Sequence, residues 1–118
     1  MTAKEAIMAF SQSEKIKSGL IWVSQSLEFV KGLSGPEKMG AERIIKAMIG
    51  MVLQEVRLAK NVAGDAMWED IEKGIDQAIV MINSGVAPES VVHLTQALSR
   101  VTGIGHRSMT FLKDMGHL

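Results

Sequence analysis

The chain has 118 residues, of which 13 are basic and 13 acidic, so it carries no formal net charge when its histidines are neutral. This length predicts a single domain, residues 1–118, and the apolar share of 47% excludes a disordered chain. The absence of cysteine excludes disulfides, zinc–thiolate sites and cysteine nucleophiles, and the balanced charge is less basic than nucleic-acid-binding proteins usually are.

Two further features concern targeting. The N-terminal segment MTAKEAIMAF lacks the apolar core of a signal peptide. The most apolar run, residues 44–63, is interrupted by charged side chains and does not fit a membrane span. We therefore expect a cytoplasmic protein with no membrane partner.

The first predicted helix has two possible starts. Thr2 with Glu5 and Ser11 with Glu14 both have the spacing of a capping box, so the helix either begins at Thr2 or breaks near Ser11. Apolar residues recur at helical spacing along the whole chain, and no segment alternates like a strand. The apolar stripe of this first helix consists of Ile16, Leu20, Val23, Leu27 and Val30.

A second long helix follows the sequence SGPE at residues 34–37, which is typical of a helix N-terminus with proline in the first turn. Its apolar stripe consists of Ile45, Ile49, Val52, Val56 and Ala59. Further apolar residues widen the surface beyond one face: Ile44, Met48, Met51, Leu53 and Leu58.

The length of these two helices predicts self-association. A helix of about 28 residues is about 42 Å long, whereas a compact chain of this size has a diameter of roughly 35 Å. We expect a second copy to cover the overhang, with Ile45, Ile49, Val52 and Val56 as the interface of a homodimer. The alternative is that the remaining helices wrap the second helix and complete its burial within one chain.

The third predicted helix begins after Gly64 and has Asp65 as its cap. Its apolar stripe consists of Met67, Ile71, Ile75, Ala78 and Ile82. Acidic residues lie along another face, namely Asp65, Glu69, Glu72 and Asp76, which could in principle hold Mg²⁺ or Mn²⁺. Acids near a helix start also suit the helix dipole, and no second acidic helix is predicted to face them. We therefore predict a solvated stripe, with no metal and no cofactor.

The C-terminal third is predicted to form two helices. The sequence NSGVAPES at residues 83–90 ends the third helix and starts a fourth, which runs to about Thr102. Gly103 and Gly105 then predict a helix stop, followed by a short fifth helix. The predicted fold is thus all-α, an antiparallel helical bundle of four to five helices with two long N-terminal helices.

The segment VTGIGHRSMTFL, residues 101–112, resembles the helix-hairpin-helix motif of DNA-binding proteins. The residues that match its pattern are Leu98, Val101, Gly103, Ile104, Gly105 and Leu112. The resemblance implies a turn whose free backbone N–H groups bind a DNA or RNA phosphate without regard to sequence, using Gly103, Gly105, His106 and Arg107. Met109 departs from the motif, which usually has a small residue there. We prefer a plain helix stop as the interpretation of this segment, with phosphate binding as the alternative.

No grouping of catalytic side chains can be read from the spacing of the residues. Trp22 and Trp68 each lie just beside the apolar stripe of their helix, a placement that suits either the rim of a core or a contact surface. We therefore predict a non-enzymatic protein that acts through self-association and partner binding. Binding of a nucleic-acid backbone is the alternative function.

Overall fold

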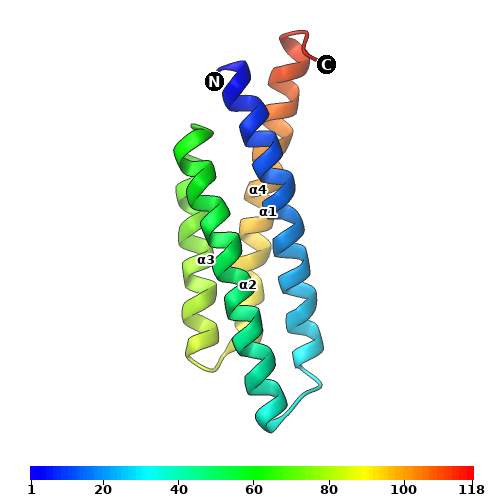
Figure 1. Ribbon diagram of the computed structural model, residues 1–118, viewed down its shortest axis with the longest axis vertical. Helices are drawn as coiled ribbons and strands as arrows, with labels where there is room; N and C mark the ends of the chain where they lie inside the picture. The colour runs from blue at the N-terminus through cyan, green and yellow to red at the C-terminus, as the bar shows by residue number, and fades with distance from the viewer.

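The protein is a bundle of four α-helices in a computed structural model that describes all residues, 1–118. The elements are α1 (Ala3–Val30), α2 (Gly35–Val62), α3 (Met67–Asn83), the short 3₁₀ helix η1 (Ala87–Glu89) and α4 (Ser90–Asp114). In Figure 1 each α-helix runs back along the one before it, so both chain ends lie at the same end of the bundle. The prediction of an all-helical fold with two long N-terminal helices is confirmed.

The first helix is continuous and begins at the earlier of its two predicted starts. The Glu5 N–H donates to Thr2 Oγ1 at 3.1 Å, and the Thr2 N–H donates to Glu5 Oε1 at 3.0 Å. This capping box satisfies two backbone N–H groups near the helix start. Ser11 lies within the helix and is exposed, so no break occurs there.

The fourth helix corrects the prediction of a stop at Gly103 and Gly105. α4 continues through both glycines to Asp114, neither glycine has a positive φ, and no separate short helix follows them. The reason is packing: Val101, Ile104 and Leu112 are buried along one face of α4. A glycine within a helix costs only about 1 kcal/mol, whereas one large buried apolar side chain contributes about 1.5–3 kcal/mol.

The core is formed by one apolar stripe from each helix, as their spacing predicts. The α1 stripe from Ile16 to Val30 and the α3 stripe from Ile71 to Ile82 are both buried. Trp68 is fully buried among them. The long helices do not overhang a compact body, because the whole molecule is elongated, with extents of 55 × 21 × 18 Å and a radius of gyration of 15.5 Å.

Helices α1 and α4 approach closely where Gly105 faces Ser13. A Cβ atom added to Gly105 would lie 2.8 Å from Ser13 Oγ and 3.6 Å from Ser13 Cβ. The Ser13 hydroxyl donates to the Phe10 carbonyl at 2.8 Å and is buried. Gly105 is therefore a packing residue of the bundle, and the Ser13 hydroxyl oxygen is the atom that an added methyl group would meet too closely.

This contact predicts the outcome of a double substitution. Gly105→Ala should lower the free energy of unfolding by about 1 kcal/mol, because overpacking costs about 1–3 kcal/mol and exceeds the gain of about 1 kcal/mol in helix propensity. In a Ser13→Ala background the same substitution should instead be stabilising. Gly50→Ala, where nothing lies within 4 Å of the added Cβ, is the matched control and should stabilise the protein. Urea unfolding of the five proteins measures this, and a loss of stability in both backgrounds would contradict it.

Candidate functional site

The predicted interface residues of α2 form part of the chain's own core. Ile45, Ile49, Val52 and Val56 are exposed by only 3%, 1%, 9% and 0%. In the folded bundle they are covered within one chain and present almost no surface to a second copy. The physical reason is that the other helices of the chain cover this stripe, which was the alternative interpretation of the sequence.

A second apolar stripe of α2 lies in solvent. Ile44, Met51 and Leu58 follow one another at intervals of seven residues, which is about two helical turns, so they share one side of the helix. The partly buried Met48 lies between the first two. Since successive residues of a helix are about 100° apart, Ile44 points away from the core that its neighbour Ile45 enters.

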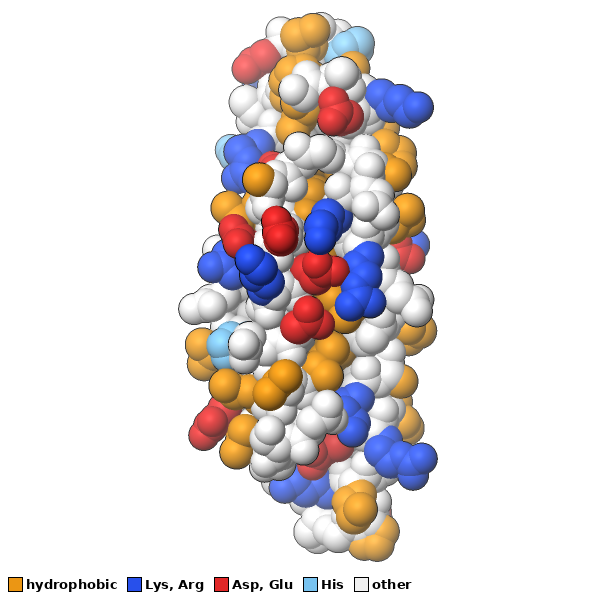
Figure 2. All heavy atoms as spheres, turned by 90° about the vertical axis from the view of Figure 1, so that its left-hand side faces the viewer, with side chains coloured by type: hydrophobic (Ala, Val, Ile, Leu, Met, Phe, Trp, Pro, Cys, Tyr) orange, Lys and Arg blue, Asp and Glu red, His pale blue; other side chains and the backbone are white.

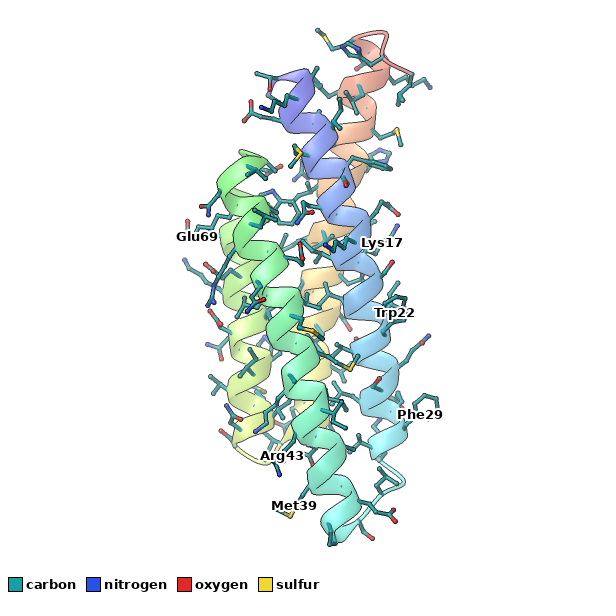
Figure 3. The ribbon with its side chains drawn as sticks, viewed as in Figure 1. Lys17, Trp22, Phe29, Met39, Arg43 and Glu69 are labelled. Carbon is teal, nitrogen blue, oxygen red and sulfur yellow. The ribbon has the colours of Figure 1, made fainter.

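Helix α1 presents two aromatic side chains next to this stripe. Trp22 and Phe29 are also seven residues apart, and Figure 3 shows both projecting from α1 away from the bundle. We name the surface formed by Trp22, Phe29, Ile44, Met51 and Leu58 the α1–α2 face. The exposed fractions of these five side chains range from 47% for Leu58 to 79% for Phe29. In the sequence these residues can be recognised because apolar side chains recur every seven positions next to the residues of each core stripe.

A groove of about 260 Å³ lies within the α1–α2 face. Seven of its eight lining residues are apolar. The lining includes Phe29 and Val30 at the end of α1, Leu33 in the connection that follows, and Ala41, Ile44 and Met48 of α2. The groove joins Phe29 of α1 and Ile44 of α2 in one apolar surface, and the other three residues of the face lie outside its lining.

The charged pair Lys15 and Glu55 lies beside this face and is internally compensated. Lys15 Nζ is 2.9 Å from Glu55 Oε1, and the Gln12 side-chain amide donates to Glu55 Oε2 at 3.0 Å. The hydrogen bond from Gln12 and the one from Lys15 lower the pKa of the Glu55 carboxyl below its ordinary value. The carboxylate therefore stays ionised and paired, and it adds no uncompensated charge to the surface.

The α2–α3 side has a different character. Figure 2 shows acidic and basic side chains intermixed near mid-height on this side. Glu72, predicted as part of a solvated stripe, is largely covered and pairs with Arg57 at 2.9 Å and with Lys60 at 3.1 Å. These two partners lower the pKa of the Glu72 carboxyl. Nowhere in the chain do three or more histidine, aspartate or glutamate side chains come together as a group that could hold a metal ion.

The lowered pKa of Glu72 predicts a pH dependence of stability. The ion pairs should contribute roughly 0.5–1 kcal/mol at pH 7. Because the pKa is lowered in the folded state, this contribution is complete above the unfolded-state pKa of about 4.5 and is lost as the pH falls through the folded-state pKa. In thermal unfolding, Glu72→Gln should therefore melt at a lower temperature than the original protein at pH 7, and at the same temperature at pH 2.5. Asp76→Asn, on the same helix but exposed and beyond its first turn, should have little effect at either pH.

The four residues predicted to bind a nucleic-acid backbone do not form one site. Gly103 and Gly105 lie inside α4, where backbone N–H groups are used by the helix itself. Arg107 Nη2 reaches Asp65 Oδ2 at 3.0 Å, and the other oxygen of Asp65 accepts from the Met67 N–H at 2.8 Å. The turn on which the phosphate site depended is therefore absent, and Arg107 ties α4 to the start of α3.

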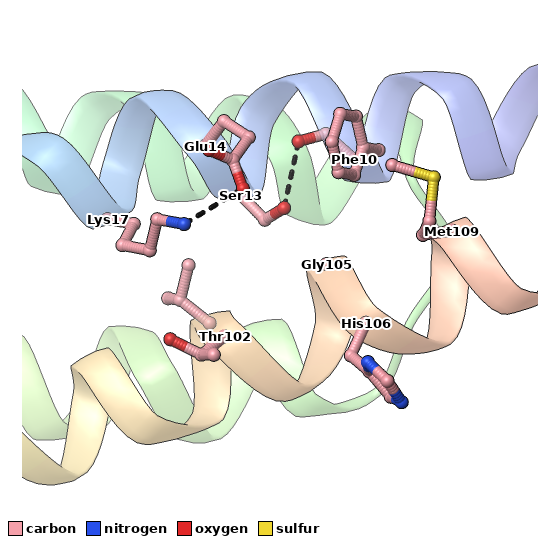
Figure 4. A pocket seen from close by; sticks show the side chains of 9 residues that line it. Phe10, Ser13, Glu14, Lys17, Thr102, Gly105, His106 and Met109 are labelled. Atoms are coloured by element: carbon pink, nitrogen blue, oxygen red, sulfur yellow. Dashed lines mark hydrogen bonds and ion pairs between the residues drawn. The ribbon is translucent and has the colours of Figure 1, made fainter.

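His106 lies at the edge of a second groove, between α1 and α4. This groove has a volume of about 240 Å³ and Gly105 forms part of its lining. Figure 4 shows the imidazole of His106 pointing away from α1, on the other side of α4 from Ser13. Lys17, which also lines the groove, pairs with Glu14 at 3.0 Å. The groove thus lacks a free cation aimed into it, and it offers no phosphate site in place of the missing turn.

The continuous α4 predicts the effect of a substitution at Gly103. The atom nearest to an added Cβ is Arg107 Nη1 at 3.2 Å, the end of a long, half-exposed side chain that needs to shift by only a few tenths of an ångström. Gly103→Ala should therefore raise the free energy of unfolding by about 0.5–1 kcal/mol through helix propensity. In a turn with positive φ the same substitution would destabilise the protein. Urea unfolding distinguishes the two results by their sign.

Comparisons with protein-family models, curated proteins and solved structures find no match for this chain. None of its helices combines the length and the apolar character that crossing a membrane requires. The α1–α2 face groups five exposed apolar side chains on two adjacent helices, and it is the surface feature from which a function can be inferred.

Proposed function

We propose that this chain is a non-enzymatic, antiparallel helical bundle that associates with itself and acts by binding, with the α1–α2 face as its contact surface. The observation that carries the proposal is the exposure of Trp22, Phe29, Ile44 and Met51, each by at least 60%, on two adjacent helices. Contiguous exposed apolar surface of this kind marks interaction sites, and tryptophan is enriched among the residues that dominate binding energy. The proposal requires no cofactor.

The other sides of the bundle offer less to a partner. On α3 and α4 the exposed apolar residues away from the chain ends are few, such as Val80 and Val92, and scattered single residues of this kind are normal on a protein surface. Binding of a nucleic-acid backbone has weaker support as a function. Arg107 is paired with Asp65, and the chain has no basic surplus.

Analytical ultracentrifugation over a range of micromolar concentrations tests the proposal. The original chain, of 12.8 kDa, should sediment as a dimer. The double variant Trp22→Glu and Met51→Glu should raise the dimer Kd at least 100-fold, since the loss of two contact residues costs on the order of 3 kcal/mol or more. Both positions are exposed in the single chain, so the helical circular dichroism signal should be retained.

The matched control is the double variant Val80→Glu and Val92→Glu, because these side chains are exposed to a similar degree, by 56% and 60%, but belong to α3 and α4. It should sediment like the original chain. A monomeric original chain at tens of micromolar would contradict self-association. Equal dissociation of the control and the Trp22 variant would contradict the choice of surface.

A further inference from the structure

We infer that two copies of this chain meet about a two-fold axis across the α1–α2 face, with Trp22 of each copy seated in the α1–α2 groove of the other. This inference rests on the proposed self-association and specifies its geometry. In a two-fold interface the same surface contacts itself, so any projecting group must find its receptacle on that same surface. The α1–α2 face provides both parts.

The projecting group and the receptacle lie side by side. Trp22 is 62% exposed and extends from α1 (Figure 3). One turn further along α1, Ser26 lines the groove, and the opposite wall is formed by Ile44 and Met48. A two-fold axis passing between Trp22 and the groove therefore brings the indole of each copy over the groove of the other.

The size of the groove favours a side chain as its occupant. Its volume of about 260 Å³ lies below the range of about 300–1,000 Å³ that is usual for small-molecule pockets. Its lining is almost entirely apolar, so it lacks the few precisely placed polar groups that orient a small ligand. An indole ring suits the small volume and the apolar lining, because it is flat, largely apolar and able to leave its N–H at the open edge.

The two exposed aromatic side chains supply part of the area that each partner of a stable dimer buries. Buried aromatic side chains cover about 150–250 Å² each, so the exposed parts of Trp22 and Phe29 provide roughly 200–350 Å². A stable interface needs about 800 Å² from each partner. Ile44, Met51 and Leu58, together with the walls of the groove, extend the apolar surface toward that area.

Charge places no obstacle to two copies meeting at this face. The chain has no formal net charge, so two copies do not repel one another overall. The ion pairs Lys15–Glu55 and Glu28–Lys31 are each complete within one copy, so neither adds an uncompensated charge to the face. A second copy therefore fits this face in shape, in apolar character and in charge.

The experiment compares a variant whose groove is filled with a variant that lacks the Trp22 side chain. Ala41→Phe places a ring in the groove, whereas Trp22→Ala removes the side chain proposed to enter it. Each variant alone should raise the dimer Kd at least tenfold in analytical ultracentrifugation. An equimolar mixture of the two should form heterodimers more tightly than either variant forms homodimers, because one intact Trp22 then meets one open groove. Val80→Phe adds a ring at an exposed site on α3 and should leave the Kd unchanged.

Tryptophan fluorescence provides a second measurement that needs no variant. Trp68 is fully buried, so iodide quenching of the original chain reports on Trp22. Quenching should increase on dilution from micromolar to nanomolar concentration, as Trp22 leaves the groove of its partner.

The outcomes separate this inference from the proposed function. The original chain could form a dimer whose Kd does not change in Trp22→Ala and whose quenching does not change on dilution. This result would overturn the seating of Trp22 and leave self-association standing. The absence of any dimer in the original chain would overturn both. Failure of the mixed variants to associate more tightly than either alone would also overturn the reciprocal seating.

Discussion

A helix in a four-helix bundle can bury only the sector that faces its neighbours, and this limit determines the surface of the protein. Helix α2 carries apolar side chains over a wider sector than the bundle covers. Ile45 and Val52 lie in the core, whereas Ile44 and Met51, about 100° before them around the helix, remain in solvent. The apolar residues that the interior cannot accommodate form, with Trp22, the surface proposed for self-association.

The interior itself depends on close helix packing at small residues. Gly105 lets α4 approach Ser13 of α1 so closely that not even a methyl group fits beside the hydroxyl oxygen. Gly19 has the same role between α1 and α2, where an added Cβ would lie 2.8 Å from Val52 Cγ2. Gly105, which resembles part of a nucleic-acid-binding turn in the sequence, thus has a packing function in the folded chain.

The charged side chains divide the surface into two chemically distinct sides. Glu72 on α3 joins Arg57 and Lys60 of α2, while Asp65 both holds the first turn of α3 and pairs with Arg107 of α4. These ion pairs are made within one copy, so none of these charges needs a partner for compensation. The α1–α2 face has an apolar excess instead, which is why the two sides are expected to behave differently in solution.

The apolar spacing and the Thr2–Glu5 capping box were enough to predict the helical class, the two long N-terminal helices and the apolar stripes of α1 and α3 that enter the core. They were not enough to decide which of the two neighbouring stripes of α2 would be buried, or whether Gly103 and Gly105 would end a helix. Periodicity specifies positions around one helix axis, but the other helices determine which of those positions they cover. A glycine changes helix stability by about 1 kcal/mol, and the burial of several large side chains of α4 against its neighbours outweighs that local preference.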